Sequence, residues 1–472
     1  MQDLSSQRET PIYQQLCQLN HAEQISLHTP GHKHGQRGAD LLKNWLPDAV
    51  SFDLTEIGDL DSIQQPDGPL SRAERLTAEL YQTRSCFFTT NGATAGLIGS
   101  LLAATVPGSE ILLPRNAHLS ALSAIILGDL MPRFVQSQSH RGRWLGINPA
   151  EVADALNRFP NVKTVLLVSP SYEGVVGDLG QLLGLAKAAG CLVVVDEAHG
   201  AHLPFHPALP PSAVALSADL VVHSAHKTLS ALTGGAWVHR VTDRISEERV
   251  RSCLNLVQST SPSWLILGSL DLARMELAIS GRNKLDLVVR NVDGLRRTMA
   301  DLGWPIWYPP AGMDFYQDPL KINLVSSRNG YSGAELARAL QQNGVYPEMV
   351  HQDGVLLMFG LGDVANRYQE LIECLYTLPK REPLAETVWD PPPLPEMRLR
   401  PRTAYFAHSH SVELGQAVGK IAARPLYIYP PGAPLVYPGE LLDSDVVSVA
   451  RRVLRSGGQL VGCRGGRIMV VK

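Results

Sequence analysis

The strongest constraint on the fold of this chain is a series of short, almost wholly apolar runs separated by helical segments. A strand with apolar residues at consecutive positions must be buried on both faces, as happens in a parallel sheet covered by helices. The sequence therefore predicts a doubly wound α/β core with a mostly parallel sheet. The predicted strands include "SCFFTT", "EILLP", "VKTVLLVSP", "CLVVVDEAHG" and "ADLVVHSAHK", and the predicted helices between them include "ATAGLIGSLLAAT", "HLSALSAIILGDL" and "LGQLLGLAKAAG".

The regions outside this core predict further units. The residues before it lack a strong strand pattern, as in an N-terminal arm. After it, helical periodicity over roughly 263–301 leads into a second unit that mixes strands and helices. A stretch dense in proline and charge then predicts a linker. The predicted units are an N-terminal arm (1–50), a large domain (51–290), a small α+β domain (291–380), the linker (381–400) and a C-terminal domain (401–472).

The composition excludes several classes of function. Of the 472 residues 18% are charged, and the formal net charge of −3 gives no electrostatic reason to expect a nucleic acid or an anionic membrane as partner. No apolar stretch has the length of a membrane-spanning helix, and the N-terminus lacks the order of a secretory signal. The six cysteines form no CxxC pair, so we expect free thiols and a cytoplasmic protein without structural zinc.

Polar residues at the ends of two neighbouring strands are the first candidates for chemistry. Asp196 ends an apolar run, where a carboxylate is costly unless a cation or a hydrogen-bond donor meets it. Lys227 follows the next run, and a buried lysine with a lowered pKa forms imines with carbonyl groups. Each also has an ordinary explanation, Asp196 as a helix cap or surface strand end and Lys227 as part of a solvated turn. His199 and His202 could cap a turn or bind a metal with Asp196, but no further ligand spacing supports a metal.

A glycine turn upstream is the third candidate. In "TTNGATAG", Gly92 precedes a small-residue helix whose first N–H groups can bind a phosphate, although most such joints bind nothing. Because the carboxyl ends of parallel strands meet along one edge of a sheet, this turn, Asp196 and Lys227 are expected to share one crevice. Together they predict a pyridoxal 5'-phosphate site, in which the turn, Ser224 and His226 hold the phosphate. Asp196 then pairs with the pyridine nitrogen, and Lys227 forms an imine with the cofactor.

Further motifs accompany these residues in a definite order. They are "TPGHKHG", "DLTEIGDLDSIQQPDGPL", "NGATAG", "NAHLS", "SPSYEGVVGDL", "DEAHGAH", "SAHKTLSALT", "QSTSPS" and "YPPGAPLVYPGE". Over nearly its whole length the chain resembles the fold-type I pyridoxal-phosphate-dependent Orn/Lys/Arg decarboxylase family, in its short form without an N-terminal wing domain. The resemblance implies an aspartate aminotransferase-like large domain, and a homodimer or higher homo-oligomer with active sites at the subunit interface.

The resemblance also implies roles for individual residues. His118 of "NAHLS" is expected to stack on the cofactor ring, and Ala198 to pack beneath it. His199, in the same motif as Asp196, is expected to face the substrate carboxylate. The implied catalytic residues are Lys227, His118, Asp196 and His199, and the implied cofactor contacts are Gly92, Ala93, Thr94, His118, Asp196, Ala198, Ser224, His226, Lys227, Ser259 and Thr260, the last two reaching the cofactor of the partner subunit.

The chain departs from the family pattern at three positions. Ala93 stands where the family more often has serine, which removes one phosphate hydrogen bond. His223 and Gly234 stand where the family has glutamine, and nothing in the sequence accounts for the glycine. These departures leave Lys227 in place but could alter substrate choice or rate.

Other polar residues have both a functional and an ordinary interpretation. Glu440 of "YPGE" and Asp67 of "QQPDG" are the candidates to meet a cationic substrate tail, although a surface position explains either equally well. The histidines of "HTPGHKHG" belong either to a solvated turn or to an arm that reaches the partner's active site. Arg84 and Arg115 are expected to be ordinary surface charges.

The residues and the resemblance together imply a carboxy-lyase that decarboxylates arginine or lysine, and less readily ornithine, to a polyamine precursor and CO2. Two alternatives stay open: another reaction of the same cofactor, such as transamination or lyase chemistry, and a non-catalytic regulator that retains the fold. The intact pair of Asp196 and Lys227 argues against the regulator, whereas Gly234 keeps it open. Guanidinium favours a planar carboxylate fork and ammonium a point charge, but the depth of the pocket is not readable from the sequence.

Overall fold

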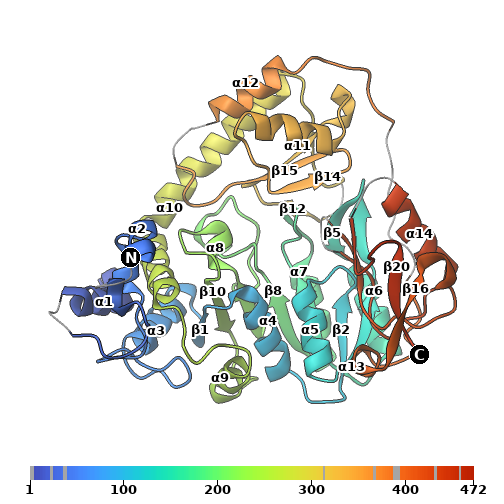
Figure 1. Ribbon diagram of the computed structural model, residues 1–472. Helices are drawn as coiled ribbons and strands as arrows, with labels where there is room; N and C mark the ends of the chain where they lie inside the picture. Colours follow the sequence, from blue (N-terminus) through green and yellow to red (C-terminus); the bar gives the residue numbers. More distant parts are fainter. Residues whose placement is uncertain are drawn as a thin grey trace.

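A seven-stranded sheet lies at the centre of the described part of the chain, with a smaller sheet and its helices above it in Figure 1. The order of the strands is β1-β10-β9-β8-β6-β2-β3. All neighbouring pairs from β9 to β3 are parallel, and only β10 runs antiparallel to both of its neighbours. The predicted mostly parallel sheet is therefore confirmed. The computed structural model describes residues 5–21, 25–35, 40–311, 314–364, 368–385, 394–429, 433–455 and 459–472.

The strands end close to where the sequence predicts. β8, for example, ends at Asp196, and β9 ends at His223, four residues before Lys227. The bounds in the large sheet are β1 Ser85–Thr89, β2 Glu110–Pro114, β3 Met131–Val135, β6 Val162–Val168, β8 Leu192–Asp196, β9 Leu220–His223 and β10 Ala236–Arg240. A hairpin of β4 (Ser137–His140) and β5 (Arg143–Ile147) follows β3 and was not predicted.

Both faces of the sheet are buried, which explains why its strands are apolar at consecutive positions. Val193 and Val195 of β8 belong to one hydrophobic core, and Val194 between them belongs to another. Successive side chains of a strand point to opposite faces, so each face needs its own apolar cover. The helices around the sheet are α3 Pro69–Tyr81, α4 Gly92–Ala103, α5 Leu119–Leu127, α6 Pro149–Arg158, α7 Leu179–Ala188, α8 Ala225–Thr228 and α9 Glu247–Asn255.

One long helix joins the large sheet to the small one. α10 spans Trp264–Asp301, as the periodicity predicts, and its 38 residues extend over about 57 Å. The small sheet has the order β11-β13-β15-β14, and a two-stranded ladder between β12 and β7 (Val175–Val176) also connects the two parts. The elements here are β11 Ile306–Trp307, β12 Tyr316–Gln317, β13 Lys321–Val325, α11 Gly333–Gln342, β14 Met349–His351, β15 Gly354–Met358 and α12 Gln369–Thr377.

Buried polar contacts fasten the N-terminal helix α1 (Pro11–His21) to α10. Asp271 and Arg274 of α10 are fully buried and lie 2.7 Å apart. The carboxylate of Asp271 also accepts the N–H of Ile12 at 3.0 Å, and Arg274 donates to the carbonyl of Gln7 at 2.5 Å. Helix α1 of the predicted arm is thus packed on the large domain, whereas the short helix α2 (Asp40–Trp45) buries none of its residues. The rest of the arm, and residues 386–393 of the predicted linker, lie outside the described residues.

A buried ion pair joins the C-terminal elements to the large sheet. Arg115, which follows β2, forms a two-point contact with Glu440 at 2.6 and 2.8 Å, and it also donates to the carbonyl of Leu435. The prediction that Arg115 is a surface charge is wrong, because its side chain lies beneath this unit beside Phe134 and Tyr437. Arg84 is exposed as expected. The C-terminal elements are α13 Pro401–Phe406, β16 Ser409–Glu413, β17 Leu426–Tyr429, β18 Ala433–Val436, α14 Ser444–Arg455, β19 Gln459–Val461 and β20 Arg467–Val471.

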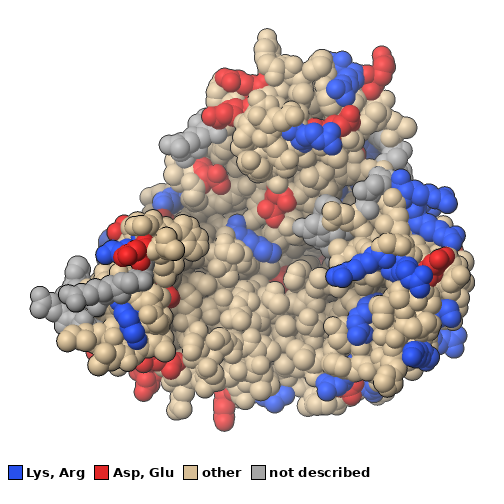
Figure 2. Space-filling view, in the orientation of Figure 1, with Lys and Arg blue, Asp and Glu red and all other residues tan. Residues whose placement is uncertain are grey.

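Lysine and arginine side chains gather over these C-terminal elements, on the right of Figure 2.

None of the helices within the described ranges combines the length and the apolar character that a membrane crossing needs.

Glu440→Gln tests the contribution of the buried pair. We expect the free energy of unfolding to fall by about 3–5 kcal/mol, because Arg115 would keep its charge in a buried site without a counter-charge. Urea denaturation followed by circular dichroism measures the change. Glu396→Gln is the matched control: Glu396 pairs with Arg398 at the surface, so its loss is expected to cost less than about 1 kcal/mol. Equal effects of the two substitutions would contradict the assignment.

Candidate functional site

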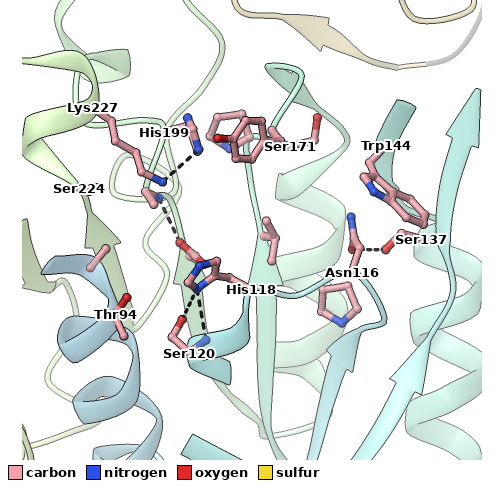
Figure 3. A pocket seen from close by; sticks show the side chains of 18 of the residues that line it. Thr94, Asn116, His118, Ser120, Ser137, Trp144, Ser171, His199, Ser224 and Lys227 are labelled. Atoms are coloured by element: carbon pink, nitrogen blue, oxygen red, sulfur yellow. Dashed lines mark hydrogen bonds between the residues drawn. The ribbon is translucent and has the colours of Figure 1, made fainter. Parts of the chain in front are cut away.

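A pocket opens where the carboxyl ends of β2, β6, β8 and β9 meet (Figure 3). It encloses about 260 Å³. Because the strands are parallel, residues far apart in the sequence reach the same edge of the sheet, the usual ligand position in such folds. The lining residues are Gly92, Ala93, Thr94, Pro114, Asn116, His118, Ser120, Ser137, Trp144, Gly146, Ile147, Val168, Pro170, Ser171, Tyr172, Asp196, Ala198, His199, Ser224, His226 and Lys227.

Lys227 stands on the short helical turn α8 directly after β9. Its side chain is half-buried, and its Nζ points at His199, 3.2 Å from Nε2 (Figure 3). Burial lowers the pKa of Lys227, while the charges of Asp196 and Glu348 partly oppose this shift. The lysine is therefore closer to the uncharged state than an ordinary surface lysine, and only an uncharged amine can attack a carbonyl carbon.

The start of α4 forms a cradle for an anion at one end of the pocket. Gly92 has a positive φ of 72°, and a Cβ at this position would meet no atom within 4 Å, so the space beside the helix start is open. The first N–H groups of a helix lack partners within it and attract negative charge. Ser224 lies nearby, with its Oγ 3.2 Å from Nδ1 of His226, which also contacts the carbonyl of Gly235.

The glycine at position 234 has a structural reason that the sequence did not reveal. Its φ of +95° is rarely adopted by L-residues, and an added Cβ would lie 3.0 Å from the carbonyl oxygen of Thr90. The Gly234 carbonyl accepts the N–H of Gly92 at 2.8 Å, so this turn supports the loop at the start of α4. Glutamine, like any other L-residue with a Cβ, would be strained in this backbone conformation.

Asp196 and His118 occupy the middle of the pocket. Asp196 is 8% exposed, and its Oδ1 accepts the N–H of Ala198 at 3.2 Å. His118 caps α5: its Nδ1 accepts the N–H of Ser120 and lies 2.8 Å from that residue's hydroxyl. Its ring is exposed towards the pocket, but the surrounding protein still disfavours the charged form and lowers the pKa of His118. His118 is thus a neutral ring at pH 7.

These residues fit pyridoxal phosphate. The pocket places anion-binding N–H groups and the Ser224 hydroxyl at one end, a carboxylate and a neutral aromatic ring in the middle, and the Lys227 amine beside them. Within the described ranges, no cluster of three His, Cys, Asp or Glu side chains could hold a metal ion.

Four of the predicted contacts lie outside this pocket. Asp67 is exposed in the loop before α3, and Ser259 and Thr260 are exposed between α9 and α10. The predicted reach of these two residues into a partner's site stays a prediction. Glu440 is fully buried against Arg115 and does not line the pocket, so the interpretation of Glu440 as a free substrate carboxylate is wrong for this chain.

Several pocket residues were not predicted. Ser137, Trp144 and Gly146 come from the hairpin of β4 and β5, Asn116 follows β2, and Tyr172 follows β6. The motif "SPSYEGVVGDL" contains Tyr172, but no chemical pattern in it singles out that tyrosine. Nothing in the sequence of the hairpin indicates that its side chains reach the pocket.

Comparison with known proteins agrees with this geometry. Residues 10–311 match the family described as "Orn/Lys/Arg decarboxylase, major domain", and residues 384–454 match the description "Orn/Lys/Arg decarboxylase, C-terminal domain". The chain belongs to the Orn/Lys/Arg decarboxylase family.

Similar proteins match over almost the whole length. The arginine decarboxylase of Bacillus subtilis is 29% identical and covers 99% of this chain and 98% of its own. A B. subtilis protein named uncharacterized protein YaaO is 32% identical and covers 94% of both chains. The solved lysine decarboxylase LdcF of Francisella novicida is 17% identical, with a TM-score of 0.87 over 99% of this chain and 82% of that one. This likeness in structure confirms the predicted fold.

A buried acid–histidine pair lies directly behind the site. Glu197 follows Asp196, and His223 precedes Ser224. The side chains of Glu197 and His223 are fully buried, and Nε2 of the histidine lies 2.7 Å from the carboxylate. Glu197 also accepts hydrogen bonds from the Ser212 hydroxyl and from a backbone N–H. Burial raises the pKa of Glu197 to about 8 and lowers the pKa of His223 to about 3, so both are neutral at pH 7. The departure to histidine at 223 thus provides a partner for a buried carboxyl group.

This pair should give stability a characteristic dependence on pH. Between pH 4.5 and 8 the folded state holds a proton on Glu197 that the unfolded state releases, so stability falls as pH rises. Between pH 3 and 6.5 the unfolded state binds a proton on His223 that the folded state does not, so stability rises with pH. The two effects cancel from 4.5 to 6.5, and only the loss due to Glu197 remains from 6.5 to 8.

We therefore compare the wild type with the double variant Glu197→Gln/His223→Gln, which keeps a hydrogen-bonding pair without titratable groups. The difference in melting temperature, wild type minus variant, is expected to decrease from pH 6.5 to 8 and again from pH 4.5 to 3. Differential scanning calorimetry across this range measures it. A difference that stays constant with pH would contradict the neutral pair.

Proposed function

We propose that this chain binds pyridoxal phosphate in the pocket and decarboxylates arginine in preference to lysine, as a homo-oligomer that supplies a polyamine precursor. Membership of the Orn/Lys/Arg decarboxylase family makes it a carboxy-lyase for a basic amino acid. The observation that carries the cofactor proposal is the convergence of the Lys227 amine, the Asp196 carboxylate and the start of α4 in one pocket. The relatives named arginine decarboxylase, at 29–30% identity, support arginine over the more distant lysine decarboxylases at 22–23%.

The residues of the pocket have separate tasks in this proposal. Gly92, Ala93, Thr94, Ser224 and His226 hold the phosphate group, and Asp196 meets the pyridine nitrogen. When bound, the cofactor withdraws electrons from the α-carbon of an attached amino acid and so stabilises the charge left by departing CO2. His118 offers a flat, neutral ring for stacking, and Ala198 leaves room on the other side. Lys227 supplies the neutral amine that anchors the cofactor.

His199 holds a proton close to the reacting atoms. Its pKa lies well below 6.5, because of burial and the nearby charges of Lys321 and Lys227, so the imidazole is neutral. A neutral imidazole has one N–H donor and one acceptor nitrogen, and Nε2 lies within hydrogen-bond distance of Lys227. We infer that His199 and Lys227 are the groups that exchange the proton which replaces CO2.

Glu348 takes the place of Glu440 as the candidate for a cationic substrate tail. It lies just before β14 and accepts a hydrogen bond from the hydroxyl of Tyr172, a pocket residue, at 2.5 Å. It is exposed, so one carboxylate oxygen can meet a guanidinium without the cost of burying a new charge. Its charge also reaches into the pocket, since it raises the pKa of Lys227 against the effect of burial.

Release of CO2 from arginine, lysine and ornithine tests the function directly. We expect the highest kcat/KM for arginine and a complete loss of turnover in Lys227→Ala, together with loss of the visible absorbance of the bound cofactor. Lys163→Ala, which removes an exposed lysine, is the control and should behave as wild type. Substantial turnover by Lys227→Ala would reject the site.

Other outcomes of the same assay separate the alternatives. Amino-group transfer to a 2-oxo acid without CO2 release would identify a transaminase. Cofactor binding without turnover of any basic amino acid would identify a regulator that retains the fold.

Glu348→Gln tests the proposed contact with the substrate tail. The KM for arginine is expected to rise about tenfold or more, the value of one lost charge-assisted hydrogen bond, with a smaller change in kcat. Steady-state kinetics on arginine measures both parameters. Glu370→Gln, an exposed glutamate on α12, is the matched control. An unchanged KM would show that the tail is recognised elsewhere.

A further inference from the structure

A second buried lysine lies directly behind the pocket. Lys321 on β13 is only 2% exposed, and its Nζ donates to the carbonyl of Tyr172 at 2.7 Å. The same Nζ lies 3.0 Å from Nδ1 of His199. Nε2 of His199 in turn lies 3.2 Å from Nζ of Lys227. A single imidazole therefore bridges two lysine amines, one from the small sheet and one from the end of β9.

The chemistry of these groups determines where the hydrogens lie. A protonated Lys321 has three N–H donors and no acceptor, so Nδ1 of His199 must accept from it. Because the imidazole is neutral, its one proton then lies on Nε2. That N–H points at Lys227, whose Nζ can accept it only as an uncharged amine. The positive charge of Lys321 and the His199 N–H thus both oppose protonation of Lys227.

We propose that Lys321 is a positioning residue for the reaction: through the tautomer of His199 it keeps the amine of Lys227 uncharged and directs an N–H at it. The proposal rests on the proposed function in taking Lys227 as the reactive amine. The proposal also explains how His199 can pass a proton to Lys227 although its imidazole stays uncharged. A proton that leaves Nε2 for Lys227 is replaced at Nδ1 by one from Lys321, so the imidazole stays neutral and Lys321 becomes the neutral amine.

The arrangement should depend on pH. Burial lowers the pKa of Lys321 to about 8, and above that pH a neutral amine can both donate and accept, so the His199 tautomer is no longer determined. We expect kcat to fall as the pH rises through about 8. The titratable and charged groups that face Lys321 are Asp318 before β13, Glu173 before β7, Glu348 before β14, Lys227 on α8 and His199 after β8.

The first experiment measures the reactivity of Lys227 without relying on turnover. The full chain, freed of cofactor, is treated at pH 7.5 with trace trinitrobenzenesulfonate, which reacts with uncharged amines, and labelling of Lys227 is quantified by peptide mass spectrometry. In Lys321→Met, labelling is expected to slow at least fivefold, because Lys227 can then keep its proton. Lys163→Met, at an exposed lysine, should label at the wild-type rate. Equal or faster labelling in Lys321→Met would overturn the proposal, since a merely loosened site would expose Lys227 more.

The second experiment uses the loaded enzyme and a variant that keeps the charge. In Lys321→Arg the guanidinium does not titrate in this range, so the fall in kcat near pH 8 should disappear while kcat at pH 7 stays within about threefold of wild type. In Lys321→Met, kcat should fall at least tenfold with little change in KM. A fall in kcat near pH 8 that persists in Lys321→Arg would overturn the proposal, even if Lys321→Met does not fold.

The two proposals fail in different ways. If the wild type releases no CO2 but Lys321→Met still slows the labelling of Lys227, the proposed function is wrong and the coupling of the two lysines stands. If the wild type decarboxylates arginine and labelling is unaffected, the coupling is wrong and the function stands.

Discussion

The uncharged state of one lysine amine is the condition on which the arrangement of this site depends. An ammonium group has no lone pair, so Lys227 can react with a carbonyl only if the fold favours loss of its proton. Burial of the side chain after β9, next to His199, lowers the pKa of Lys227 and so favours this loss. Parallel strands whose carboxyl ends meet at this edge of the sheet bring the other pocket residues to the same place.

The contact between the large and small sheets completes the site. Lys321 and Glu348 belong to the small-sheet region, yet Lys321 contacts His199, which in turn contacts Lys227. The charge of Glu348 raises the pKa of Lys227 against the effect of burial. The continuous helix α10 and the ladder between β7 and β12 connect the two parts. Lys321 and Asn323 of β13 also donate hydrogen bonds to the carbonyls of Tyr172 and Glu173, which holds β13 beside the large domain. Under the proposed roles of Lys321 and Glu348, catalysis depends on how the two sheets pack.

Local pattern was enough to predict the elements that generate the pocket. The sequence predicts Asp196 and Lys227 as site residues because a charged residue near the end of an apolar strand is costly unless it has a partner. The predictions for Arg115 and Glu440 were wrong because these two residues pair with each other across 325 positions of the chain. No local pattern indicates such a pair. Gly234 could not be explained without its φ and the carbonyl of Thr90 beside it. No sequence pattern distinguishes Lys321, because it begins a strand as many surface lysines do.

The α/β architecture, the positions of the strand ends and membership of the family can be read from the sequence, and the same reading predicts Lys227 as the reactive lysine. These follow from short-range facts: hydrophobic period, turn residues and ordered motifs. Which charged side chains are exposed and which are already paired became clear only from the packing of the sheets. In the folded chain Glu440 is buried in an ion pair, and Glu348 is exposed beside Tyr172. Lys321 is buried and contacts His199. The physical reason is that the charge state and partners of a side chain depend on burial and on groups from distant elements, which meet only when the sheets pack together.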